Sequence, residues 1–62
     1  MSDPPAKEDR ERARDLATRA RALHEQKAYY QARDLYQQSL DLVEDDEVRA
    51  SYRRLMATIG PM

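Results

Sequence analysis

Apolar residues recur along most of this chain at the spacing of amphipathic helices. No glycine or proline lies between residues 6 and 26, so a helix can continue through that stretch. Its apolar positions form one stripe, in which Ala13, Leu16, Ala20 and Leu23 follow a 3-4-3 spacing and Ala17 lies beside them. Asp3 ahead of Pro4 and Pro5 is typical of a helix start. The pattern predicts a first helix over about residues 5–26.

Two more helices are predicted after it. The stripe of the second, over about residues 28–43, consists of Tyr29, Ala32, Tyr36, Ser39 and Val43, and is widened by Leu35 and Leu42. The acidic run Glu44–Glu47 then interrupts the pattern and offers a carboxylate that can cap the next helix. The third helix, over about residues 47–59, places five apolar residues on one side: Val48, Tyr52, Leu55, Met56 and Ile59. Gly60 followed by Pro61 is typical of a helix end.

The corner between the first two helices is expected at Gln26–Ala28, although it lacks the glycine common at a helix C-terminus. One uninterrupted helix from Ala6 to Val43 is the alternative. The two stripes hold more apolar surface than one isolated helix can cover, which favours a hairpin. We therefore predict an all-α fold, a three-helix antiparallel bundle. Residues 6–59 form its single domain, between an N-terminal lead of residues 1–5 and a C-terminal tail of residues 60–62.

The composition indicates that this bundle packs through small residues. The chain has 62 residues, of which 40% are hydrophobic, but it contains no Phe and no Trp. A core of this size is only marginally adequate, so close helix packing, a partner or an oligomer must add stability. The 11 basic and 12 acidic side chains nearly cancel, which gives no general electrostatic reason to bind nucleic acid or an anionic membrane.

The sequence shows no disulfide-forming cysteines, signal peptide or membrane span that would indicate secretion or a membrane location. There is no cysteine, as is common in a reducing interior. The N-terminus lacks the apolar core of a signal peptide, and no apolar run approaches the roughly 18 residues of a membrane span. We expect a cytoplasmic location and no membrane insertion.

No constellation of side chains predicts catalysis, a metal site or a cofactor. His24 is the single histidine, and an ordinary place at the end of the apolar stripe suits it better than a catalytic or metal role. The acidic run Glu44–Glu47 lacks the alternating spacing and central glycine of a calcium loop. A phosphate-binding loop would need several glycines, and Gly60 is the only one. We expect a protein that is not an enzyme.

The arginines of the first predicted helix could also form a surface that binds nucleic acid. Arg10, Arg14 and Arg21 share a face of the first helix, but three acidic residues interleave with them: Glu11, Asp15 and Glu25. The pattern favours a solvated helix face.

The run from Ala13 to Leu40 resembles the first two helices of an MIT (microtubule interacting and trafficking) domain. That family has small residues along its first helix and Tyr-x-x-Ala-x-x-Leu-Tyr-x-x-small along its second. The matching residues here are Tyr29, Ala32, Leu35, Tyr36 and Ser39. The third helix is similar to the family's closing helix, although it and its linker are shorter than usual.

The same residues also look like one tetratricopeptide (TPR) repeat followed by a capping helix. The small positions of that repeat would be taken by Ala20, Ala32, Tyr36 and Ser39. Against this alternative, Lys27 stands where the repeat usually has glycine, and stacked arrays normally need about three repeats.

The MIT resemblance implies a non-catalytic adaptor that binds a short helical or extended peptide in a groove between helices. In that family the peptide is the C-terminal tail of an ESCRT filament subunit, and the domain recruits a linked enzyme to it. The groove between the second and third helices is the usual place for a helical ligand. Carried onto this chain, its apolar contacts are Leu42, Tyr52, Leu55 and Met56, and its acidic contacts are Asp41, Glu44 and Asp45.

Two alternatives remain open at this point. The apolar residues named for the groove, above all Tyr52 and Leu55, are equally well explained as core. The chain itself could instead be a self-associating TPR-like hairpin with a structural role in assembly, or a fragment of a longer TPR scaffold, natural or engineered. We expect a protein or peptide partner, no nucleic acid, and a monomer or weak homodimer.

Overall fold

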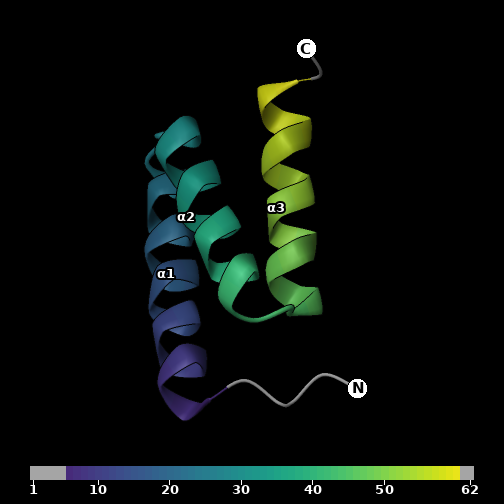
Figure 1. Cartoon of the computed structure of the whole chain (residues 1–62). Helices are drawn as coiled ribbons and strands as arrows, with labels where there is room; N and C mark the ends of the chain where they lie inside the picture. The colour runs from purple at the N-terminus through teal and green to yellow at the C-terminus, as the bar shows by residue number, and fades with distance from the viewer. Residues whose placement is uncertain (1–5, 61–62) are drawn as a thin grey trace.

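The computed structural model describes residues 6–60, which form three helices that run alternately up and down (Figure 1). They are α1 (Lys7–Glu25), α2 (Tyr29–Leu42) and α3 (Asp46–Ile59). The predicted all-α three-helix bundle is therefore confirmed, with helix ends within two residues of those expected. The helix start expected at residues 3–5 lies outside the described residues, as do the rest of the lead and residues 61–62 of the tail.

A hydrogen-bonded corner separates α1 from α2, which excludes one continuous helix. The Lys27 amide donates to the His24 carbonyl (3.0 Å), and the Ala28 amide donates to the Leu23 carbonyl (2.8 Å). These two bonds form the motif that commonly ends a helix with a residue in the left-handed conformation. Lys27 takes that conformation with φ 68°, at the place where glycine is usual. The chain thus turns sharply without glycine.

The second corner is built by acidic residues. The Asp45 carboxylate accepts from the backbone amides of Glu47 (2.8 Å) and Val48 (3.4 Å), so it caps the N-terminus of α3. Glu44 receives two hydrogen bonds from the Arg49 guanidinium, at 2.8 and 2.7 Å. The capping carboxylate predicted in the acidic run is confirmed as Asp45.

Small residues let α1 and α2 approach closely. Ala20 of α1 and Ala32 of α2 are both 0% exposed. Buried Ser39 donates a 2.8 Å hydrogen bond from its hydroxyl to the carbonyl oxygen of Ala13, which ties the two helices together. Tyr36 and Leu55 are the large side chains at the centre of the core. Around them pack partly buried apolar residues from all three helices: Leu23, Tyr29, Leu35, Val48, Tyr52 and Ile59.

The three helices do not contact one another equally. α2 lies between the other two and packs against both, whereas α1 and α3 contact each other far less (Figure 1). Because α1 and α3 scarcely touch, the bundle is open on the side where these two helices stand apart.

Candidate functional site

The residues expected to line a groove between α2 and α3 lie in different surroundings in the structure. Leu55 is 0% exposed and belongs to the core, so it does not line an open groove. Asp41 and Leu42 lie on the other flank of α2, where they line a hollow of about 270 Å³ together with Arg12, Leu16 and Gln38. That hollow lies between α1 and α2 and includes no residue of α3.

The other expected contacts have partners within the chain or lie half-buried on α3. Glu44 pairs with Arg49, and Asp45 caps α3, as described above. Tyr52 is half-buried against the core, and its hydroxyl accepts a 3.0 Å hydrogen bond from the Gln37 side chain. Met56 is half-buried as well. Tyr52 and Gln37 thus connect α2 and α3 along the seam that the sequence suggested as the groove.

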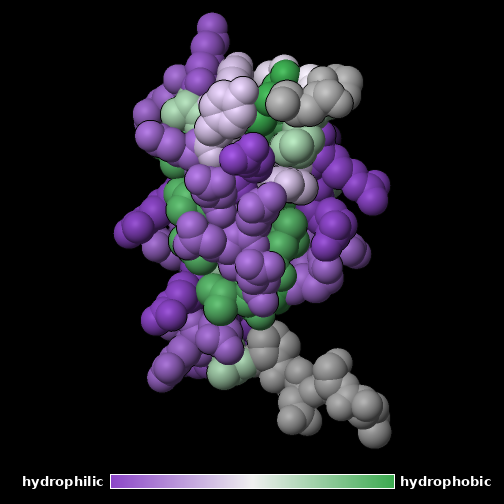
Figure 2. Space-filling model, turned by 45° about the horizontal axis from the view of Figure 1, so that its top comes forward, coloured by the Kyte–Doolittle hydropathy of each residue, from purple (hydrophilic) through white to green (hydrophobic). Residues whose placement is uncertain are grey.

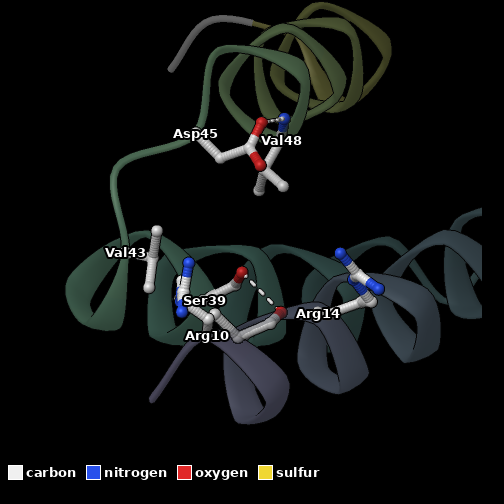
Figure 3. Close-up of a pocket in the computed structure, with 7 residues that line it drawn as sticks. Arg10, Arg14, Ser39, Val43, Asp45 and Val48 are labelled. Carbon is white, nitrogen blue, oxygen red and sulfur yellow. Dashed lines mark hydrogen bonds between the residues drawn. The ribbon is translucent and has the colours of Figure 1, made fainter. Parts of the chain in front are cut away.

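Two hollows lie instead between α1 and α3. The smaller one has a volume of about 130 Å³ and is shown in Figure 3. Arg10 and Arg14 line it from α1, and Ser39, with its hydrogen bond to Ala13, lies at its floor (Figure 3). On the α3 side the lining includes Val48.

The larger hollow, of about 440 Å³, lies nearer the α1–α2 corner. Its floor is aromatic, because Tyr29 and the almost fully buried Tyr36 contribute to it. The His24 ring stands edge-on to Tyr29, with 5.7 Å between the ring centroids. The remaining lining residues come from α1, the corner and α3: Arg21, Glu25, Lys27, Ser51, Arg54 and Thr58.

The two hollows share no lining residue, but both lie on the side where α1 and α3 stand apart, which we call the α1–α3 cleft, and basic side chains line each of them. Arg10, Arg14 and Arg21 are spaced by four and seven residues, which places them on one flank of α1. Lys27 and Arg54 add positive charge around the larger hollow. The acidic residues in the lining are Glu25 and Asp45, and the second of these caps α3.

No ion pair within residues 6–60 neutralises the positive charge of the cleft. Among residues 6–60, the ion pairs join Arg19 to Asp15, Arg33 to Asp34 and Arg49 to Glu44. None of these pairs includes a basic residue of the cleft. The chain has a formal net charge of −1, so the cleft is a local positive region on a nearly neutral protein.

Part of this site is predictable from the sequence, which places Arg10, Arg14 and Arg21 on a common face of α1 with acidic residues interleaved. Of these acids, Asp15 pairs with Arg19, Glu11 lies beside Arg10 and Arg14 in a neighbouring hollow outside the cleft, and Glu25 lines the larger hollow. Lys27 and Arg54 also line the larger hollow of the cleft. The sequence does not indicate this, because it does not show that α3 stands apart from α1.

The surface around the helices is mainly polar. In Figure 2 hydrophilic side chains cover most of the visible face, and hydrophobic ones emerge in smaller areas between them. No helix within residues 6–60 has both the length and the apolar character needed to cross a membrane. In the same part of the chain, no three His, Asp or Glu side chains gather in a way that could hold a metal ion.

The fold and the cleft define a small all-α protein, a three-helix bundle with an open basic side. No family model, curated protein or solved structure matches the chain.

Proposed function

We propose that this chain is a non-catalytic protein-interaction module whose α1–α3 cleft binds an acidic peptide segment of a partner protein. The observation that carries the proposal is the set of basic side chains lining the two hollows of the cleft, none of which forms an ion pair with another of residues 6–60. Arginine is suited to this role because its planar guanidinium can bind a carboxylate through two parallel hydrogen bonds.

The shape of the cleft supports a peptide rather than a small molecule. Its two hollows lie at different levels along the helices, and the partly exposed apolar residues in their floor and walls are Tyr29, Val43 and Val48. An acidic segment with one or two apolar side chains would place its carboxylates on the arginines and its apolar groups on this floor. Ser51, in the wall of α3, adds a hydroxyl that can donate to or accept from a peptide backbone.

Nucleic acid is the less favoured anion. A single strand would need exposed aromatic faces on which its bases could stack. Tyr36, at the floor of the larger hollow, is 2% exposed and presents no such face, and Tyr30, which is 63% exposed, lines neither hollow of the cleft. The small net charge of the chain also gives no long-range attraction to a polyanion.

The resemblance to an MIT domain gives this proposal a specific form. On that basis the peptide is the C-terminal tail of a filament-forming, ESCRT-type subunit, and the module is an adaptor that recruits a linked enzyme to the filament. The proposed cleft differs from the expected groove in place and in charge. It lies between α1 and α3 and is basic. The groove expected from the sequence lies between α2 and α3, and its acidic contacts would pair with basic residues of a ligand.

A titration followed by backbone amide NMR tests the proposal. We expect acidic peptides, including tails of filament subunits, to shift the amide signals of Arg21, Ser51 and Arg54. A basic peptide of the same length should shift none of them. Each arginine acts at an exposed site where salt screens its charge, so affinity should fall as ionic strength rises.

Two neighbouring arginines of α3 provide matched variants. Arg54 lines the cleft, whereas Arg53 lines a shallow surface hollow made only of α3 residues. Arg54→Glu should lower the affinity for the acidic peptide by about tenfold or more, and Arg53→Glu should leave that affinity nearly unchanged. Shifts centred on Tyr52 and Met56 would move the site to the α2–α3 seam. Tighter binding of a single-stranded oligonucleotide than of any acidic peptide would reject the proposal.

A further inference from the structure

A second surface of the hairpin lies outside the cleft, along the flank where Leu16 and Leu42 line a hollow between α1 and α2 and where the partly buried Leu23 and Leu35 also pack against the core. Leu16 and Leu23 of α1 are seven residues apart, as are Leu35 and Leu42 of α2. All four are half-buried, whereas Leu55 alone among the leucines is fully buried. We call the surface formed by these four leucines the outer edge of the hairpin. We propose that the outer edges of two copies of this chain pack together in a symmetric dimer.

The position of the outer edge follows from the hollow between α1 and α2. Arg12 and Leu16 line this hollow from α1, and Leu42 lines it from α2, with no residue from α3. The cleft arginines Arg10 and Arg14 occupy the other flank of α1. A partner on the outer edge would therefore leave the cleft free.

Leucine spacing indicates the kind of partner that fits. Apolar residues seven positions apart on neighbouring antiparallel helices are the pattern from which four-helix bundles are built. One copy supplies two such helices and leaves their leucines half-exposed to solvent. A second copy supplies another two helices. If the two-fold axis is parallel to the helices, each of the four helices is antiparallel to its neighbours.

Charge complementarity favours a second copy over an unrelated helix. Arg12 and Asp41 are both exposed and line the same hollow, so they lie at the same level along the hairpin. With the two-fold axis along the bundle, α1 of one copy faces α2 of the other. Arg12 of each copy is then opposite Asp41 of the other, and the surface is complementary to itself.

The small core gives the dimer a physical reason. Among residues 6–60, three of the five buried apolar residues are alanines, which bury little surface each: Ala13, Ala20 and Ala32. A chain of this size with so few large buried side chains gains stability from any surface that covers its half-buried leucines.

Sedimentation equilibrium over a range of protein concentrations tests the dimer. We expect the fraction of dimer to rise with concentration, and to fall when Arg12→Asp or Asp41→Arg places like charges opposite each other. Both residues are exposed, so the variants should keep their helical circular dichroism. The double variant Arg12→Asp/Asp41→Arg restores opposite charges and should restore the dimer. An equimolar mixture of the two single variants should form a heterodimer, because every facing pair in it is then attractive.

Arg53→Asp on α3 is the matched control, because it changes the charge by the same amount away from the outer edge. It should leave dimerisation unchanged, and so should the cleft variant Arg54→Glu, which separates this proposal from the peptide-binding one. A wild-type chain that remains monomeric up to high concentration would overturn the proposal. So would single variants that weaken the dimer without rescue in the double variant or the mixture.

Discussion

The hydroxyl of Ser39 in α2 lies 2.8 Å from the carbonyl oxygen of Ala13 in α1 and donates a hydrogen bond to it, across 26 residues of sequence. Ser39 is 1% exposed, so this bond is shielded from water. It lies at the floor of the smaller hollow of the cleft (Figure 3). The same contact thus fastens the hairpin and forms part of the candidate binding surface.

Removing this hydroxyl should weaken the fold moderately. Ser39→Ala loses one buried hydrogen bond but keeps the close approach of the helices, so we expect the free energy of unfolding to fall by about 1 kcal/mol. Ser39→Leu inserts a larger side chain at the same place and should destabilise by about 1–3 kcal/mol through overpacking. Urea unfolding measures both. Ser51→Ala, at a half-buried position of α3, is the control and should have a smaller effect than either.

Lys27 is predicted to be a site where a simple change stabilises the protein. Its φ of 68° is unfavourable for a side chain with a Cβ, by about 1 kcal/mol, and glycine carries no such cost. Lys27→Gly should raise the free energy of unfolding by about that amount, whereas Lys27→Ala keeps the strain and should not. Because Lys27 lines the cleft, the glycine variant should also bind an acidic peptide more weakly. Equal stability of the glycine and alanine variants would contradict the strain argument.

Leu55 and Leu42 should respond very differently to truncation. Leu55 is fully buried among residues of the core, so Leu55→Ala should cost about 2–5 kcal/mol and could unfold a bundle this small. Leu42 is half-buried on the outer edge, and Leu42→Ala should cost clearly less in the monomer. Thermal unfolding at low protein concentration, below any dimerisation, compares them. Similar costs at the two positions would mean that Leu55 is not the central core residue of α3.

The pair formed by Glu44 and Arg49 should be visible in a pH titration. The hydrogen bonds from Arg49, more than its charge alone, hold the pKa of the Glu44 carboxyl below the usual range of a glutamate. The same pairing raises the pKa of Arg49. Since the pKa of Glu44 is depressed in the folded state, its stabilising contribution is present above the unfolded pKa. That contribution is lost as the pH falls through the folded pKa.

Carbon-detected NMR of the glutamate carboxyls measures this shift directly. We expect Glu44 to titrate at lower pH than in the Arg49→Gln variant, where its pKa should return toward the usual range. Both side chains are exposed, so the accompanying change in stability should be small. A Glu44 carboxyl with the same pKa in both proteins would show that the pair does not persist in solution.

Helix number, helix ends and the main core residues could be predicted from the sequence, because each depends on local spacing. Ala20, Ala32 and Tyr36 lie on the predicted stripes and are buried. Lys27 marked the corner in spite of its missing glycine, because the apolar surface on either side could be covered only by folding the chain back.

The grouping of side chains around a binding surface could not be predicted in the same way. Leu42 lies at the border of the apolar stripe of α2, and spacing alone does not tell which neighbouring helix it meets. The answer depends on which side of the hairpin α3 packs against, and that is a property of the whole bundle. For the same reason Arg21 and Arg54, which are far apart in the sequence, were not recognised as facing one cleft.

The alanines between α1 and α2 have a consequence for how this protein tolerates change. In a leucine-rich core the largest side chains are the ones that cannot be replaced. Here Ala20 and Ala32 have no exposed surface, so even one added methyl group at either position would force the two helices apart. The positions that look most ordinary in the sequence are therefore the ones with the least freedom to vary.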